Sequence, residues 1–178
     1  MNKMPNLVAL CGAAGSGKST CAEHMSIYYG YTPLKFAGPL KEMLRALGLS
    51  QTQIEGNQKE APTDILCGKT PRQAMQTLGT EWGRNMIGGD LWVNAWTNRV
   101  ASILRNGGRV VVDDCRFPNE LDAVLALGGV AVRIHRPDRA QVNQHCSETG
   151  LDDVDMRIVF NDADVYTLVE RVVDAACE

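Results

Sequence analysis

The residues best suited to chemistry lie in one short stretch, CGAAGSGKST at positions 11–20. The stretch fits the pattern G-x-x-x-x-G-K-[ST], which is met by Gly12, Gly17, Lys18 and Ser19. In such a loop the backbone N–H groups curl around a β-phosphate, the lysine bridges the β- and γ-phosphates, and the hydroxyl ligates Mg²⁺. Because an apolar run precedes the loop and a helical pattern follows it, a nucleotide-binding loop is a better interpretation than a Gly-rich turn without a ligand.

The expected ATP site consists of this loop and two later arginines. The loop residues are Gly12, Ala13, Ala14, Gly15, Ser16, Gly17, Lys18, Ser19 and Thr20. Arg136 and Arg139 flank Pro137 directly after the apolar stretch VAVRIH, and the polar residues that follow predict a lid at about 136–150. For Arg139 a solvated surface side chain is an equally good interpretation, and His145 is more simply a surface histidine.

A second group of candidate residues lies in VVVDDCRFPNE at 110–120. The apolar strand ends at Asp113 and Asp114, where a carboxylate beside the loop can hold Mg²⁺ through water. We assign the metal to Ser19 and Asp114, and a turn with a helix cap is the alternative for the aspartates, more so for Asp113. Arg116 lies just beyond the strand end, which faces the ligand crevice in open α/β sheets, and a guanidinium there suits a bidentate grip on a phosphate. The catalytic set is therefore Lys18, Asp114, Arg116 and Arg136.

The middle of the chain carries residues suited to a second ligand. Arg72 falls in the first turn of a predicted helix, where a cation is unfavourable, and this indicates an anionic ligand. Trp82 and Trp92 flank GRNMIGGD, and an aromatic ring there could stack on a base. Packing in the core explains each tryptophan at least as well.

These residues need a scaffold in which strands alternate with helices. Apolar runs at 6–11, 32–38, 109–114, 130–136 and 157–162 predict five strands, with helical patterns between them and a closing helix that carries Val165, Leu168, Val169 and Val172 on one face. Thr70, Pro71 and Gln73 form a capping box. We therefore expect an α/β, three-layer P-loop fold with a five-stranded, mainly parallel sheet. Residues 1–178 would form a single domain with an acceptor-binding helical region at about 38–105 and the small lid.

Charge and composition narrow the class of partner. The formal net charge is −3 and no block of basic residues occurs, so polymeric nucleic acid is not an expected partner. No apolar run approaches the roughly 20 residues of a membrane helix, and the N-terminus lacks a signal peptide pattern. The six cysteines are scattered without a C-x-x-C pair, which predicts reduced thiols in a cytoplasmic protein. A homodimer is compatible with the sequence.

Eight segments, taken in order, resemble the phage deoxynucleoside monophosphate kinases, a branch of the nucleoside monophosphate kinase-like P-loop fold. They cover nearly the whole chain and are SGKST, FAGPLKEML, RQAMQTLGTEWGR, LWV, DDCRFPNELDA, VRIHRP, HCSETGL and NDADVYTLVERV. By this resemblance, Asp114, Arg116 and Glu120 match D-x-R-x-x-x-E, and Arg72, Gln76 and Gly79 match R-x-x-x-Q-x-x-G-T. The expected residues around the acceptor nucleotide are therefore Lys41, Arg72, Gln76, Trp82, Trp92, Arg116 and Glu120, and the resemblance implies Arg136, His145 and Glu148 for the lid.

The resemblance implies transfer of the γ-phosphate of ATP, with Mg²⁺, to a deoxynucleoside monophosphate, giving ADP and a deoxynucleoside diphosphate for DNA synthesis. The location would be the cytoplasm, and the host cytoplasm if the protein is phage-encoded. Independently of the resemblance, a phosphate acceptor with a second pKa of about 6 is ionised at neutral pH and needs cations rather than a general base. Two alternatives stay open: a small-metabolite P-loop kinase of the phosphomevalonate kinase type, for which Asp113 could act as a base, and an ATP-binding module without turnover.

Overall fold

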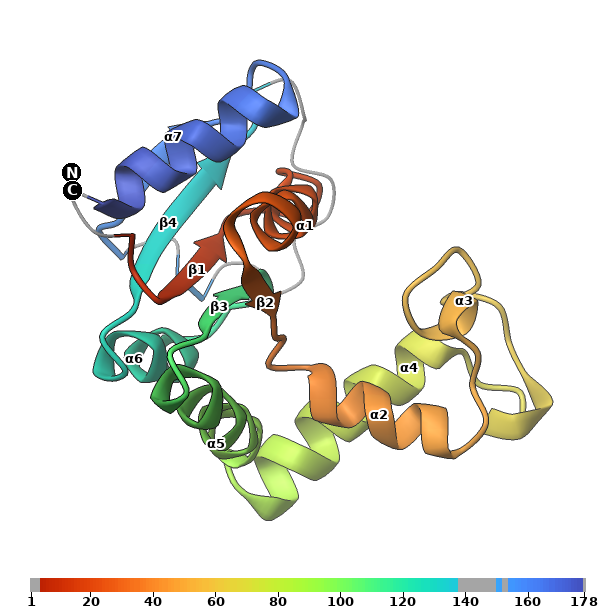
Figure 1. Cartoon of the computed structure of the whole chain (residues 1–178). Helices are drawn as coiled ribbons and strands as arrows, with labels where there is room; N and C mark the ends of the chain where they lie inside the picture. The colour runs from red at the N-terminus through yellow and green to blue at the C-terminus, as the bar shows by residue number, and fades with distance from the viewer. Residues whose placement is uncertain (1–3, 138–149, 152–153, 178) are drawn as a thin grey trace. The chain divides into compact units, whose positions relative to one another are not determined.

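The computed structural model describes residues 4–137, 150–151 and 154–177 (Figure 1). The chain forms two compact units. The first unit combines residues Met1–Lys35 with Thr97–Glu178, and the second unit consists of Phe36–Trp96. The border between them falls at Trp96, inside a helix that spans Leu91–Arg105.

The first unit is built on a five-stranded sheet in the order β2-β3-β1-β4-β5. The strands are β1 (Leu7–Cys11), β2 (Tyr31–Pro33), β3 (Arg109–Val112), β4 (Val130–His135) and β5 (Arg157–Phe160). Every pairing between them is parallel, which confirms the predicted five-stranded parallel sheet. β2 is shorter than the predicted strand at 32–38, since it ends at Pro33.

Helices cover both faces of this sheet. They are α1 (Lys18–Tyr29), α6 (Pro118–Ala126), α7 (Val165–Cys177) and the C-terminal part of α5 (Leu91–Arg105). Alternate residues of β1 show the layers, because successive side chains of a strand point to opposite faces. Val8 and Leu10 belong to the core that α1 and α7 share, whereas Leu7 lies close to Gly129, where Val124 of α6 also packs.

The second unit is helical. It contains α2 (Gly38–Ala46), α3 (Gln51–Ile54), the 3₁₀-helix η1 (Asp64–Leu66), α4 (Pro71–Gln76), the π-helix η2 (Thr77–Ile87) and the start of α5. The capping box at Thr70 and Gln73 is present at the start of α4, and a second one at Ser50 and Gln53 starts α3. A small core of Leu44, Leu49 and Ile54 holds α2 and α3 together.

η2 departs from the ordinary helix that the sequence predicted. Its last turn closes with a bond from the N–H of Gly88 to the carbonyl of Gly83, which is the i to i+5 spacing of a π-helix.

Within the described residues, no helix is both long and apolar enough to span a membrane. Five cysteines of the same residues are free thiols: Cys11, Cys21, Cys67, Cys115 and Cys177.

Candidate active site

The first unit gathers polar side chains at the carboxyl ends of its parallel strands. The residues that follow the five strands, in the order of the sheet, are Lys35, Asp113, the loop 12–19, Arg136 and Asn161. β1 lies between β3 and β4. The connection from β1 runs toward β2 at one edge of the sheet, whereas the connection from β3 runs the other way, past β1, to β4. In open α/β sheets such a switch point forms the ligand crevice.

The loop after β1 depends on its glycines for shape. Gly12 has a φ of 127° and Gly17 a φ of 107°, values that L side chains rarely adopt. A Cβ atom on Gly12 would lie 2.3 Å from the carbonyl oxygen of Ile134, and one on Gly17 would lie 2.5 Å from Nδ2 of Asn161. The loop therefore packs backbone against β4 and against the residue after β5, and neither position admits a side chain.

Polar groups line the inside of this loop. The ammonium of Lys18 donates to the carbonyl oxygens of Gly12 at 2.6 Å and Ala13 at 2.7 Å. The Ser16 hydroxyl is buried and finds no hydrogen-bond partner among the described residues. Asn161 donates from Nδ2 to the carbonyl of Ser16 at 2.8 Å, which fastens the loop to the end of β5. These features suit a loop whose polar atoms are kept for a ligand.

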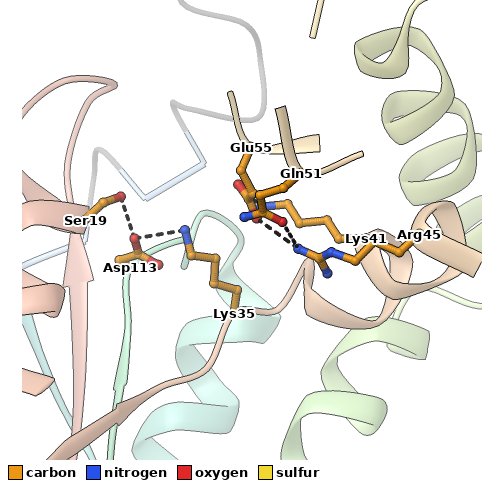
Figure 2. A network of polar contacts seen from close by, with 7 residues as sticks. All are labelled: Ser19, Lys35, Lys41, Arg45, Gln51, Glu55 and Asp113. Carbon is orange, nitrogen blue, oxygen red and sulfur yellow. Dashed lines mark hydrogen bonds and ion pairs between the residues drawn. The ribbon is translucent and has the colours of Figure 1, made fainter. Parts of the chain in front are cut away.

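A hydroxyl and a carboxylate meet next to the loop (Figure 2). Ser19 donates from its hydroxyl to Oδ2 of Asp113 at 2.6 Å, and the ammonium of Lys35 lies 3.3 Å from the same oxygen. The sequence assigned the metal to Asp114, but the structure brings Asp113 to Ser19. The reason is the alternation of side chains along the strand: Val111 faces the core with α1, so Asp113, two residues on, points to the same side as Ser19.

The pair of Ser19 and Asp113 fits Mg²⁺. Both side chains offer oxygen, which this hard cation prefers. Across the described part of the chain, no three His, Cys, Asp or Glu side chains come together as a metal cage. Mg²⁺ is usually held by one or two protein oxygens together with substrate phosphates and water.

Glu120 has a structural task in the loop after β3. It is 3% exposed, and its Oε2 accepts from the backbone N–H of Arg116 at 2.8 Å and of Phe117 at 3.2 Å. The carboxylate thus caps the N-terminus of α6, where a negative charge is favourable. The residue thereby fixes the backbone of Arg116, whose side chain is exposed, while its predicted contact with the acceptor stays a prediction.

Two buried thiols belong to residues that adjoin the site in the sequence. Cys11 ends β1 and Cys115 follows Asp114, and both are buried. The hydrogen bond with Cys115 lowers the pKa of Cys11, and the positive charges of Arg133 and Lys18 act in the same direction against the effect of burial. The same hydrogen bond and burial raise the pKa of Cys115.

Two predicted cations of the second unit are engaged in ion pairs. Arg72 donates to Glu60, and both side chains are more than half exposed. This pair accounts for a cation in the first turn of α4, which the sequence took as a sign of an anionic ligand. Lys41 lies 2.9 Å from Oε1 of Glu55, and Arg45 donates to Gln51 at 3.1 Å beside it (Figure 2).

The two tryptophans of the second unit differ in exposure. Trp92 is 5% exposed and donates from Nε1 to the carbonyl of Gly79 at 2.8 Å. It fills the space left by Gly83, where a Cβ atom would lie 2.5 Å from that nitrogen. The buried ring of Trp92 fits packing in the core, the second interpretation that the sequence left open, better than a stacking surface for a base. Trp82 is half-buried, with its ring centroid 6.1 Å from that of Trp92.

For the remaining predicted residues the structure gives only exposure, or no description. Gln76 is exposed at the end of α4, and Arg136 is exposed after β4. Arg139, His145 and Glu148 lie outside the described residues, and their roles stay predictions.

The sequence analysis missed three residues of the first unit. Lys35 and Asn161 each follow a strand, a position that could have drawn attention to them. Arg133 donates to the carbonyls of Leu151 and Val154 from within β4, and no local pattern signals that contact.

Comparison with known proteins gives relatives at two levels. A family model described as deoxynucleotide monophosphate kinase matches residues 68–172. A protein of Acanthamoeba polyphaga mimivirus, provisionally named as such a kinase, is 36% identical over 157 residues, which cover 82% of this chain and 81% of the relative. The deoxynucleotide monophosphate kinase of Enterobacteria phage T4 is 23% identical over 233 residues, which cover 93% of this chain and 96% of the phage protein.

Solved structures show the same fold at lower sequence identity. A sugar kinase from a Janibacter species has a TM-score of 0.52 at 12% identity, with 96% of this chain and 93% of that chain covered. Shikimate kinase from Aquifex aeolicus also has a TM-score of 0.52 at 12% identity, with 95% of each chain covered. These likenesses confirm the P-loop kinase fold that the sequence predicted.

Proposed function

Because the chain belongs to the deoxynucleotide monophosphate kinase family, a family of phosphotransferases, we propose specific roles for its residues in the reaction. The reaction moves a phosphoryl group from ATP to a deoxynucleoside monophosphate. The products are ADP and a deoxynucleoside diphosphate. The observation that carries the proposal is the pair of Ser19 and Asp113 beside the loop 12–19, at the carboxyl edge of a parallel sheet.

The donor half of the reaction is assigned to the first unit. The backbone N–H groups of the loop 12–19 bind the phosphates of ATP, together with the positive end of α1. Lys18 exchanges the carbonyls of Gly12 and Ala13 for oxygens of the β- and γ-phosphates. The exchange is between comparable hydrogen bonds, so it costs little, whereas the negative charge that builds up during transfer is met only by the ammonium.

The proposed metal ligand is the Ser19 hydroxyl. Its proton is donated to Asp113, so a lone pair of the oxygen is left for Mg²⁺, and Asp113 adds a negative charge nearby. When bound, Mg²⁺ neutralises charge on the transferring phosphoryl group and orients it. Asp113 here takes the place that the sequence gave to Asp114.

The acceptor half is assigned to arginines and polar side chains. Arg116 is exposed after β3, and its backbone is fixed by Glu120, which suits a residue that must hold a phosphate in a defined place. Arg72 and Gln76 lie on α4 and are proposed to contact the deoxynucleotide. Arg72 would give up its pair with Glu60, an exposed pair whose loss costs little.

No general base is needed in this proposal. The second pKa of the acceptor phosphate is about 6, so its attacking oxygen is already ionised at neutral pH. Repulsion between two anions is the main obstacle, and Lys18, Arg116 and Arg136 supply the positive charge that offsets it. Lys41 and Trp92, which the sequence placed at the acceptor, are assigned instead to the internal packing and ion pairs of the second unit.

The test is an assay of ADP release with ATP and Mg²⁺ over a panel of deoxy- and ribonucleoside monophosphates, including modified pyrimidines. Mevalonate phosphate serves as the acceptor from another kinase class. We expect turnover with one or more deoxynucleotides, and the panel then gives the base preference. Activity with mevalonate phosphate alone, or ADP release that does not depend on any acceptor, would contradict the proposal.

A further inference from the structure

Lys35 places a positive charge at the proposed metal pair. Its ammonium lies 3.3 Å from Oδ2 of Asp113, the same oxygen that accepts the Ser19 hydroxyl at 2.6 Å (Figure 2). The side chain of Asp113 is 4% exposed and that of Lys35 is 32% exposed. A lysine therefore reaches from a more exposed position to a carboxylate that is almost completely buried.

The backbone holds Lys35 at this point. The preceding residue, Leu34, donates from its N–H to the carbonyl of Val111 at 2.9 Å, so the chain after β2 runs beside the end of β3. β2 and β3 are neighbours in the sheet, and the next strand, β1, carries the phosphate-binding loop. The long, flexible stem of a lysine can still move its ammonium by several ångströms around this fixed backbone.

The Lys35 ammonium and a divalent cation would compete for the same Asp113 carboxylate. A buried carboxylate without a positive neighbour is costly, and Lys35 supplies that neighbour. Mg²⁺ next to Ser19 and Asp113 would supply the same compensation with twice the charge. The ammonium and the metal would then repel each other at the same oxygen.

We propose that Lys35 is a placeholder cation at the metal pair. It compensates Asp113 while no metal–nucleotide complex is bound. With Mg²⁺ bound, the Lys35 ammonium would leave Asp113 and contact the phosphoryl group only during transfer, as negative charge builds up there. Lys35 then adds positive charge where the transferring group needs it. This inference rests on the proposed function, because it assumes that Ser19 and Asp113 hold the metal with a nucleotide.

A merely structural role for Lys35 predicts the opposite sign. If the lysine only orients Asp113, its removal leaves the carboxylate disordered and weakens the binding of the metal. If it is a placeholder, its removal takes away a competitor, and the metal binds more tightly while turnover falls. The two roles are therefore separated by the direction in which metal affinity changes.

The experiment uses the full chain with a non-hydrolysable ATP analogue and Mn²⁺ as the spectroscopic probe, with free Mn²⁺ followed by electron paramagnetic resonance. We expect Lys35→Met to bind Mn²⁺ roughly twofold to fivefold more tightly than the wild type, as for the loss of a partly exposed ion pair. Its kcat with the best deoxynucleotide should fall at least ~10-fold. Lys35→Arg keeps the charge and should keep the wild-type Mn²⁺ affinity, while Lys69→Met, an exposed lysine of the second unit, is the matched control.

The change in Mn²⁺ affinity of Lys35→Met decides the inference. Weaker or unchanged Mn²⁺ binding in Lys35→Met overturns the inference, whatever happens to kcat. Lys35→Gln repeats the measurement if the Met variant does not fold, and the same sign is required of it. Failure of the proposed function would show instead as a wild-type protein without turnover on any deoxynucleotide, a result that does not depend on the Mn²⁺ titration of the variants.

Discussion

The Ser19 hydroxyl donates to the Asp113 carboxylate at 2.6 Å, although 94 residues separate the two in the sequence. Ser19 lies in the first turn of α1 and Asp113 directly after β3, so the contact depends on β1 and β3 being neighbours in the sheet. The hydrogen bond orients the hydroxyl and leaves its lone pair for a metal. This contact is the basis of the assignment of Asp113 rather than Asp114.

Asp113→Asn should lower kcat by roughly 100-fold, because the amide carries no charge to support Mg²⁺. Asp114→Asn is the matched control on the neighbouring residue and should retain most of the activity. Steady-state kinetics with saturating ATP and deoxynucleotide, together with circular dichroism of both variants, measure the difference. A larger loss in Asp114→Asn than in Asp113→Asn would return the metal to Asp114.

Asn161→Ala should weaken ATP binding, because the Asn161 amide fastens the phosphate-binding loop through the carbonyl of Ser16. The loss of one such hydrogen bond is worth about 1 kcal/mol, which corresponds to a KM for ATP raised by roughly fivefold. Asn98→Ala, an exposed asparagine on α5, is the control. An unchanged KM for ATP in a folded Asn161→Ala protein would show that the loop keeps its shape without this bond.

Gly83→Ala should destabilise the second unit, because the added methyl group would meet the Trp92 ring at 2.5–2.7 Å. Overpacking of this kind costs typically 1–3 kcal/mol. Gly89→Ala is the control, since nothing lies within 4 Å of a Cβ atom there. The free energies of unfolding from urea titrations give the comparison, and equal values for the two variants would contradict the packing described for Trp92.

Asp164→Asn should make the protein less sensitive to acid. Asp164 caps α7: it accepts from the N–H of Thr167 and of Tyr166 and from the Thr167 hydroxyl, and the bond from the Thr167 N–H is the largest cause of its lowered pKa. Since the folded state prefers the ionised form, this stabilisation is present above the usual carboxyl pKa and is lost as the pH falls through the lowered one.

The measurement for Asp164 is the melting temperature of both proteins as the pH is lowered from neutral to acid. Asparagine keeps a capping oxygen but does not titrate. The difference in melting temperature between the wild type and the variant should therefore become smaller toward low pH. Asp162, whose pKa is lowered by its pair with Arg171, is present in both proteins and cancels in the comparison. A gap that widens as the pH falls would contradict this account.

Local patterns were sufficient for much of the fold. A few consecutive or regularly spaced residues are enough to predict three features: the phosphate-binding loop, the capping box at Thr70 and the apolar stripe of α7. The order of strands was not accessible in this way, because it depends on which parallel strands pair across long connections. Lys35 could not be placed at Asp113 without that order, since their contact requires β2 beside β3.

Side-chain direction accounts for the remaining differences. A shift of one residue at the end of β3 decides whether Asp113 or Asp114 faces α1, and composition alone carries no such information. Trp92 and Glu120 have residue types that suit ligand binding as well as a structural role. Only their burial favours the structural role: Trp92 is 5% exposed and Glu120 is 3% exposed. The π-helix η2 was not foreseen, because helices of this kind are rare and no local sequence pattern distinguishes the stretch from an ordinary helix.

The most direct test of phosphoryl transfer follows a label from the γ-phosphate of ATP in the wild type and in Lys18→Ala. In the wild type we expect the label in a deoxynucleoside diphosphate, with ADP formed in equal amount. Lys18→Ala should fold normally and transfer at least ~100-fold more slowly, since it lacks the charge that meets the transferring group. Label released as inorganic phosphate whether or not a deoxynucleotide is present, or near wild-type transfer by Lys18→Ala, would contradict the account.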